Sequence, residues 1–170
     1  MADTFKKIAS VTVGAGGAGT IAFTSIPQTY TDLKVLLSTR STYSAGFDSL
    51  GIYFNGSQAD ISNRNIGGNG SSASSSSSTY RAIGTNDSAF ATANTFANTE
   101  IYISNYAGST FKSMSVDSVA ENNATPANVL LVANLWSQTA AITALTFDNS
   151  TSGQNFVQYS TATLYGISKS

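Results

Sequence analysis

The chain has 170 residues, of which 41% are hydrophobic and 10% are charged, and its formal net charge is −1. This length suits a single domain spanning 1–170, and so small a charge provides no long-range attraction to nucleic acid or to an anionic membrane. The sequence has neither Cys nor His, which excludes disulfides, thiolate zinc sites, Ser-His-Asp triads and every metal site that uses histidine.

Alternating apolar and polar residues predict short strands in the N-terminal half of the chain. The predicted strands cover 9–13, 20–26, 33–40 and 50–56, and the last of them ends on an Asn-Gly turn signal. The glycine-rich segment 14–19 has the composition of a phosphate-binding loop. Such a loop needs a helix N-terminus directly after it. Because the residues that follow have the pattern of a strand, we interpret the segment as a hairpin turn.

The segment GGNGSSASSSSS, residues 67–78, is the least regular part of the sequence. We interpret it as a long, flexible Ser/Gly-rich loop inside one domain. Division of the chain there would leave an N-terminal piece of about 70 residues with no disulfide or metal, which is marginal for independent folding. Two roles stay open for the loop: a mobile tip without a function, or a segment that becomes ordered only against a neighbouring subunit.

Strands are predicted throughout the C-terminal half as well. They cover 100–106, 114–122, 129–136, 142–149 and 156–167, whereas 89–100 is expected to be loop or extended chain. The sequence VLLVANLW, residues 129–136, is apolar on both faces, which is typical of a strand covered on both sides. Many short strands with no amphipathic helix between them predict an all-β fold, an antiparallel two-sheet β-sandwich with jelly-roll-like connections.

Few residues suggest chemistry. Asp117 with Glu121, set against Asp148 with Asn149, would be the candidate for an acid pair in glycoside hydrolysis. The same oxygens would be candidates for Ca²⁺ binding, but no spacing matches a recognised calcium loop. Trp136 and the tyrosines would be able to stack on sugar, yet packing in a core or in a subunit interface is the commoner use of such side chains. We therefore predict no catalytic, cofactor-binding or metal-binding residue, and no enzymatic activity.

Three stretches carry information beyond the strand pattern. They read IASVTVGAGGAGTIAFTSIPQTYTDLKVLLSTRS (8–41), SVDSVAENNATPANVLLVANLWSQTAAITALTF (115–147) and QYSTATLYGI (158–167). Together they resemble a group of virion proteins of tailed bacteriophages from marine and freshwater sources, including cyanophages. The likeness spans most of the chain, with 67–78 as its variable part. It implies a β-sandwich subunit displayed on the virion, and it carries over no catalytic residues.

The resemblance leads us to expect a capsid decoration (cement) protein. Such a protein would bind the major capsid protein and copies of itself, as a homotrimer at symmetry axes. The alternative is a tail- or fibre-associated domain that recognises a glycan on the host surface. No stretch of about 20 apolar residues is present to span a membrane, and the N-terminus lacks the pattern of a signal peptide. We therefore expect assembly in the host bacterial cytoplasm and exposure on the particle, without a nucleic-acid or membrane partner.

Residues 1–7 precede the first predicted strand with no turn signal between them, so we expect them to continue outward as an N-terminal arm. Phe5 would serve as an apolar anchor, and Lys6 and Lys7 supply the concentrated charge of this segment. We hypothesise that these three residues bind a capsid subunit or a sister subunit, since segments that become ordered on contact enlarge an interface. The loop 67–78 would pack near the seam between subunits or stay mobile.

Overall fold

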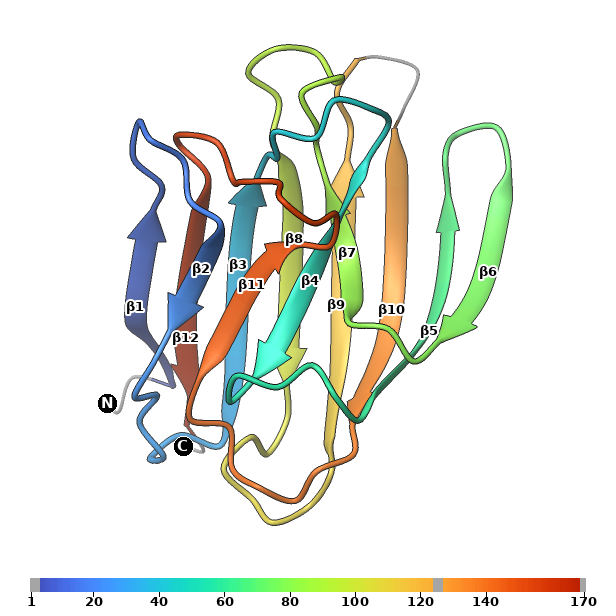
Figure 1. Ribbon diagram of the computed structural model, residues 1–170. Coiled ribbons are helices and arrows are strands. Elements are labelled where there is room, and N and C mark those ends of the chain that lie inside the picture. Colours follow the sequence, from blue (N-terminus) through green and yellow to red (C-terminus); the bar gives the residue numbers. More distant parts are fainter. Residues whose placement is uncertain (1–3, 124–126, 169–170) are drawn as a thin grey trace.

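The computed structural model describes residues 4–123 and 127–168, and this part of the chain contains strands, turns and bends but no helix (Figure 1). One sheet has eight strands in the order β1-β12-β3-β8-β9-β10-β5-β6, and a second has four in the order β2-β11-β4-β7. The strands are β1 (Phe5–Thr12), β2 (Thr20–Phe23), β3 (Asp32–Thr39), β4 (Asp48–Phe54), β5 (Ile61–Gly68), β6 (Ala73–Ser78), β7 (Ala82–Asn86), β8 (Ala97–Ile103), β9 (Lys112–Ala120), β10 (Asn128–Trp136), β11 (Leu145–Asn149) and β12 (Thr161–Ile167).

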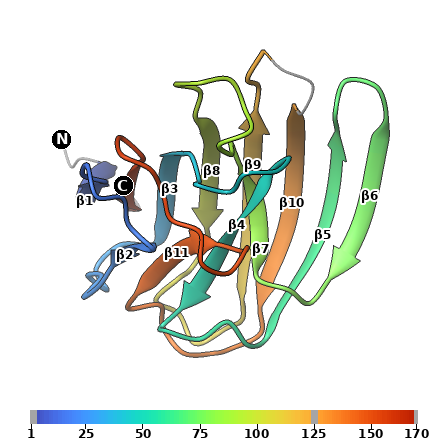
Figure 2. The same cartoon turned by 45° about the horizontal axis from the view of Figure 1, so that its top comes forward.

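The two sheets lie face to face and enclose one hydrophobic core (Figure 1, Figure 2). The eight-stranded sheet contributes buried side chains such as Leu33 and Val35 of β3, and the four-stranded sheet contributes Ile52 and Phe54 of β4 and Phe147 of β11. Neighbouring strands pair antiparallel throughout both sheets. The predicted all-β sandwich of two antiparallel sheets is therefore confirmed, and its jelly-roll-like connectivity stays a prediction.

Period-two alternation gives the eight-stranded sheet two different faces. In β9, Met114 and Val116 are buried against the four-stranded sheet, whereas Ser115 and Asp117 between and after them are exposed. This alternation follows from strand geometry, because successive side chains point to opposite sides of the sheet. We call the face turned away from the four-stranded sheet the outer face.

Residues 4–123 and 127–168 form no second layer over the outer face, and this corrects one expectation for β10. Val129 and Leu131 point to the outer face and are 49% and 53% exposed, while Val132 and Trp136 are buried on the inner face. The prediction that this strand is covered on both sides is therefore wrong. Its apolar outward residues have the composition of a buried strand, but they lie at the surface.

The Ser-rich segment is a strand, which corrects the prediction of a flexible loop at 67–78. Residues 67–68 end β5, a short turn follows, and Ala73–Ser78 form β6, which pairs antiparallel with β5 from Gly68 opposite Ala73 to Asn63 opposite Ser78. Backbone hydrogen bonds to a neighbouring strand do not depend on side-chain type, so pairing overrides the weak strand preference of serine. All six residues of β6 are exposed.

The expected N-terminal arm is also largely a strand. Phe5, Lys6 and Lys7 lie in β1 and pair with Ile167, Gly166 and Tyr165 of β12. Backbone pairing along this edge holds the three residues in the sheet, so they do not project as an arm. Of the rest of the predicted arm, residue 4 precedes β1, and residues 1–3 lie outside the described residues.

Of the two glycine-containing turns predicted from the sequence, one is confirmed and the other connects different strands from those expected. Asn55 and Gly56 have φ values of 51° and 80°, the positive values that a two-residue hairpin turn requires. Gly17 has a φ of 70°, and β2 follows the glycine-rich segment, so no helix N-terminus is present there to bind phosphate. That segment joins β1 of one sheet to β2 of the other, so it is an arch and not the hairpin we expected.

Two buried cations hold loops at opposite ends of the sandwich. The Arg40 guanidinium donates hydrogen bonds to three carbonyls within 91–95, at 2.7 to 3.0 Å. The Lys112 ammonium donates to carbonyls within 108–110 and to that of Thr139, at 2.5 to 3.2 Å. Burial lowers the pKa of Lys112, since the charged form loses hydration. These loops are therefore anchored by charge-assisted hydrogen bonds to side chains of the sheet.

Candidate interaction surfaces

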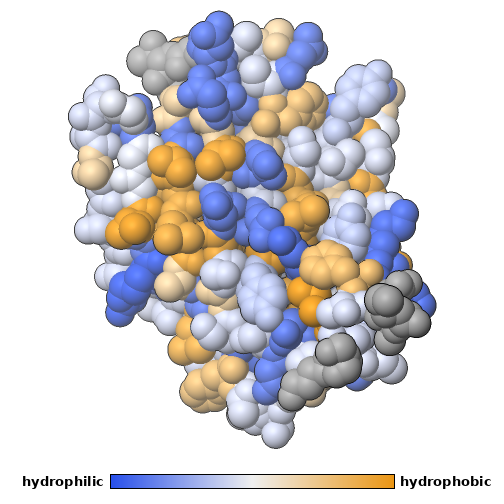
Figure 3. All heavy atoms as spheres, turned by 180° about the vertical axis from the view of Figure 1, so that it is seen from behind, coloured by the Kyte–Doolittle hydropathy of each residue, from blue (hydrophilic) through white to orange (hydrophobic). Residues whose placement is uncertain are grey.

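The outer face carries a row of large side chains that runs across five strands. Strand register places Leu36, Glu100, Asp117, Leu131 and Ile66 side by side on β3, β8, β9, β10 and β5. Figure 3 shows this face, with apolar residues in a broken band and hydrophilic ones between them. The face therefore combines exposed apolar side chains, which mark interaction sites, with charged side chains that would select the partner.

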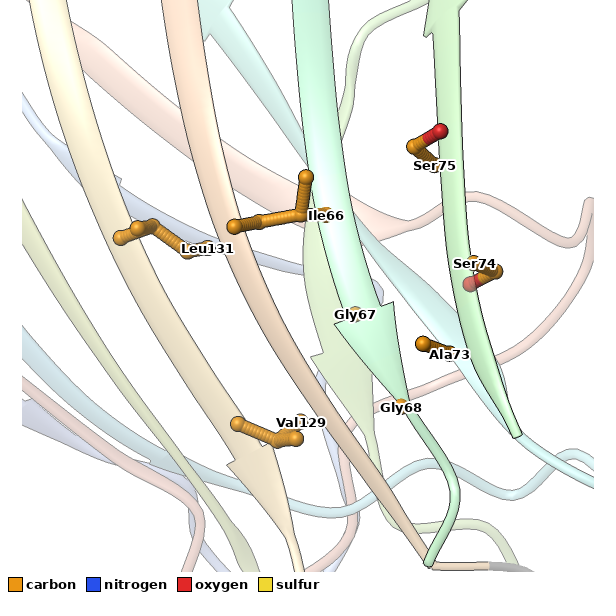
Figure 4. A pocket seen from close by; sticks show the side chains of 8 residues that line it. All are labelled: Ile66, Gly67, Gly68, Ala73, Ser74, Ser75, Val129 and Leu131. Carbon is orange, nitrogen blue, oxygen red and sulfur yellow. The ribbon is translucent and has the colours of Figure 1, made fainter. Parts of the chain in front are cut away.

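The apolar part of this row borders a groove that we call the apolar groove. It has a volume of about 640 Å³ and is lined by Ile66, Gly67, Gly68, Ala73, Ser74, Ser75, Val129 and Leu131. Figure 4 shows Ile66, Val129 and Leu131 on β5 and β10, and the short side chains of β6 beyond the two glycines. The groove exists because Gly68, which lies between Val129 and Ala73 in the sheet, has no side chain to occupy the space above it. The apolar groove was not predicted from the sequence, although the apolar residues on both faces of β10 would have been a signal for it.

The charged part of the row has an excess of acid. Glu100 forms an ion pair with Lys34 at 2.6 Å. Asp117 lies directly opposite Glu100 on the next strand, and it has no ion-pair partner among residues 4–123 and 127–168. Like charges in directly opposed positions destabilise a sheet. A basic group from a partner at this point would therefore relieve the repulsion.

The structure does not bring the predicted partner-binding residues to the apolar groove. Phe5 is half-exposed, its ring centroid lies 5.2 Å from that of Tyr165, and Lys34 approaches the same ring. Lys7 lies opposite Tyr165, so Phe5 and Lys7 share a face, and Lys6 between them points the other way. β1 and β6 are the two ends of the sheet, so these residues and the groove occupy its opposite margins.

A second candidate site, which we call the tyrosine cleft, lies on the side of the four-stranded sheet that faces away from the core. The Arg81 guanidinium stacks between the rings of Tyr53 and Tyr80, with centroid distances of 4.9 and 5.5 Å. Arg81 also forms an ion pair with Asp148, and the Tyr53 hydroxyl donates a hydrogen bond to Asp148 at 3.0 Å. Burial, followed by the bond to Asp148, raises the pKa of Tyr53.

The tyrosine cleft has a volume of about 530 Å³, and most of its lining is polar. Beyond the stacked group, it is lined by Gly19, Thr20, Gln58, Asn149, Ser150, Ser152, Gly153, Gln154 and Asn155. Its geometry depends on a glycine: a methyl group at Gly51 would overlap atoms of both Arg81 and Asp148. The sequence offered no signal for this cleft, because Tyr53, Arg81 and Asp148 come from separate parts of the chain.

The acid pairs considered from the sequence do not form. Asp117 points outward from β9, whereas Glu121 lies beyond the strand end and accepts a hydrogen bond from the Asn123 amide at 2.9 Å. Asp148 is ion-paired with Arg81. Asn149 points to the opposite side of β11. No group of three or more acidic side chains gathers anywhere in 4–123 and 127–168.

Trp136 packs in the core and is therefore not exposed to stack on a sugar. It is buried, and its ring stacks on Phe54 with a centroid distance of 5.0 Å. The two side chains come from facing sheets, so their contact ties the layers together. The tyrosines divide between roles, since Tyr106 is fully buried whereas Tyr80 is half-exposed at the cleft.

Comparisons with known proteins give no match to this chain among family models, curated proteins or solved structures. Across the described ranges, no helix has the length and apolar character needed to cross a bilayer.

Proposed function

We propose that this protein is a non-enzymatic structural subunit of a tailed-phage virion, a capsid decoration protein that docks on the assembled shell through the outer face. One observation carries the proposal. Nine large apolar side chains are exposed among the described residues, and five of them lie on the outer face: Phe5, Leu36, Ile66, Val129 and Leu131. Exposed apolar patches of this kind mark interaction sites.

The outer face is large enough for this role. With strands about 4.8 Å apart and about 3.3 Å per residue, eight strands of six to nine residues span roughly 900 Å². A specific interface needs roughly 800 Å² from each partner. The work of the protein is then binding alone, since one subunit that contacts two shell proteins opposes their separation.

The charged side chains of the outer face indicate which kind of shell surface it would bind. Asp117 and Glu100 lie side by side on the outer face, and among the described residues the one ion pair that either of them forms is that of Glu100 with Lys34. A capsid surface that offers apolar side chains near β10 and a Lys or Arg near β9 would satisfy both features, and the basic group would gain a paired carboxylate. The resemblance to phage virion proteins supplies the identity of the particle.

The test is a binding assay on particles stripped of this protein. Leu131→Asn places a polar, uncharged side chain at an exposed position in the apolar part of the row, without adding a third carboxylate beside Asp117 and Glu100. It should weaken binding by at least about tenfold. Phe111→Asn is the matched control, because Phe111 is equally exposed but lies in the loop before β9. Equal binding by the Leu131 variant and the unchanged chain would refute docking through this face.

The tyrosine cleft favours a second candidate function, the recognition of a host glycan by a tail- or fibre-associated protein. An exposed tyrosine ring beside several amide and hydroxyl groups is a chemistry that suits the apolar and polar sides of a sugar. Copy number separates the two functions: hundreds of copies per virion indicate decoration, and a few dozen or fewer indicate a tail. Tyr80→Ala should abolish glycan binding only if the second candidate is right.

A further inference from the structure

Each sheet of the sandwich has two edge strands, and three of the four edges are protected. β1 carries Lys6 and Lys7 and a bulge between Lys7 and Ala9, devices that discourage pairing with another chain. β2 has only four residues. β7 is covered, because the Thr85 amide donates a hydrogen bond of 3.0 Å to Ser118 in the facing sheet.

The fourth edge, β6, has none of these features. It is a regular strand of six residues with the sequence ASSSSS, without a charged residue or proline. It pairs with β5 in unbroken register, and β5 is the one strand against which it packs closely. Its other edge presents backbone N–H and C=O groups to solvent, and a flat, uncharged edge of this kind is a template for a further strand.

We propose that β6 pairs antiparallel with β6 of a second copy of this chain, which joins two eight-stranded sheets into one. Directly opposed residues in an antiparallel pair point to the same face. A symmetric pair must therefore centre on one residue, either Ser75 opposite Ser75 of the second copy or Ser76 opposite Ser76 of the second copy. The symmetry is two-fold, in contrast to the three-fold arrangement expected from the sequence.

A second copy fits this edge for three reasons. All side chains of β6 are Ala or Ser, so identical strands meet without steric or like-charge conflict. Arg64, the one charged residue of β5, lies one strand away opposite Ser77. The net charge of −1 gives two copies little mutual repulsion. A partner of different composition would have to match an edge that offers no side-chain pattern to recognise.

The pairing also places both outer faces on the same side of the joined sheet, because the two-fold axis is perpendicular to it. The two apolar grooves then flank the seam, with their β5 strands about 14 Å apart, three strand spacings. This arrangement extends the self-association expected from the sequence, and it doubles the face available for the docking that we propose. Pairing through β6 is measured on the purified protein, without particles. A negative result would therefore leave the docking proposal untouched.

Single cysteines test the geometry directly, since the chain has none of its own. Opposed Cβ atoms in an antiparallel pair are about 4.5–5.5 Å apart, close to disulfide distance. Ser75→Cys or Ser76→Cys, whichever marks the centre, should form a covalent dimer rapidly on mild oxidation. Ser71→Cys, in the exposed turn before β6, should not. Equal rates for all three variants, or no dimer from either strand variant, would overturn the proposal.

A charge test covers the case in which cysteine itself disturbs the edge. The double variant Ser75→Lys/Ser76→Lys opposes like charges in either register, and the dimer dissociation constant should rise at least about tenfold. Ser71→Lys/Ser109→Lys adds the same charge outside the strands and should leave dimerisation unchanged. Sedimentation should give the mass of a dimer for the unchanged chain. A trimer, or a monomer at every concentration, would refute two-fold pairing through β6.

Discussion

The substitution Gly51→Ala tests how the tyrosine cleft is built. The added methyl overlaps atoms of Arg81 and Asp148, whose side chains are 9% and 16% exposed. One of them must move, which breaks the ion pair and removes the stacked guanidinium from Tyr53. Loss of a buried pair costs about 3–5 kcal/mol. Alanine restores about 0.5 kcal/mol by restricting the unfolded chain, so we expect a net loss of about 3 kcal/mol in the free energy of unfolding.

Urea unfolding followed by the fluorescence of the single tryptophan provides the assay, since Trp136 is buried in the core. Gly16→Ala is the control, because a methyl group there meets open space, and it should be neutral or slightly stabilising. In a chain that also carries Arg81→Ala and Asp148→Ala, the cost of Gly51→Ala should disappear. An equal cost in both backgrounds would show that the glycine serves the strand and not the ion pair.

Three further predictions concern the core, a loop and pH. Phe54→Ala removes the ring that stacks on Trp136 and should cost about 3–5 kcal/mol, which calorimetry would register as a fall in Tm of about 10 °C. Arg40→Met removes the guanidinium that binds three loop carbonyls, so limited proteolysis should cut within 91–95 much faster than in the parent chain. The hydrogen bond to Asp32, followed by burial, raises the pKa of Tyr102. The contribution of this tyrosine to stability is present below pH 10 and is lost as pH rises through the folded pKa, so Tyr102→Phe should flatten the fall of the urea midpoint above pH 10.

Alternation in the sequence was sufficient to predict most strands. Leu33, Val35 and Leu37 repeat with period two in β3 and all point into the core, so local pattern and tertiary position agree. β7 was missed because AIGTN has a glycine and an asparagine where strand formers are expected. Its place is set by distant contacts, among them the hydrogen bond of 2.7 Å from Asn86 to Asn149.

The surfaces were harder to predict than the strands. Apolar residues on both sides of β10 were interpreted as a buried strand, since the sequence records apolar character but not whether a further layer covers the outer face. The tyrosine cleft depends on the pairing of β11 with β4, which sets Asp148 opposite Gly51. The strand β6 depends on β5 for its hydrogen bonds. In each case the decisive neighbour belongs to another part of the chain.

The order of strands also has a consequence for folding kinetics. β1 pairs with β12, and β2 pairs with β11, so the two outermost pairs join segments separated by nearly the whole described chain. Loop-closure entropy rises only slowly with length, but topologies dominated by such distant pairs fold slowly, in milliseconds to seconds. The meander β8-β9-β10 is the longest run of consecutive strands that pair as neighbours. We expect this meander to form first and to serve as the template on which the earliest and latest strands of the chain assemble.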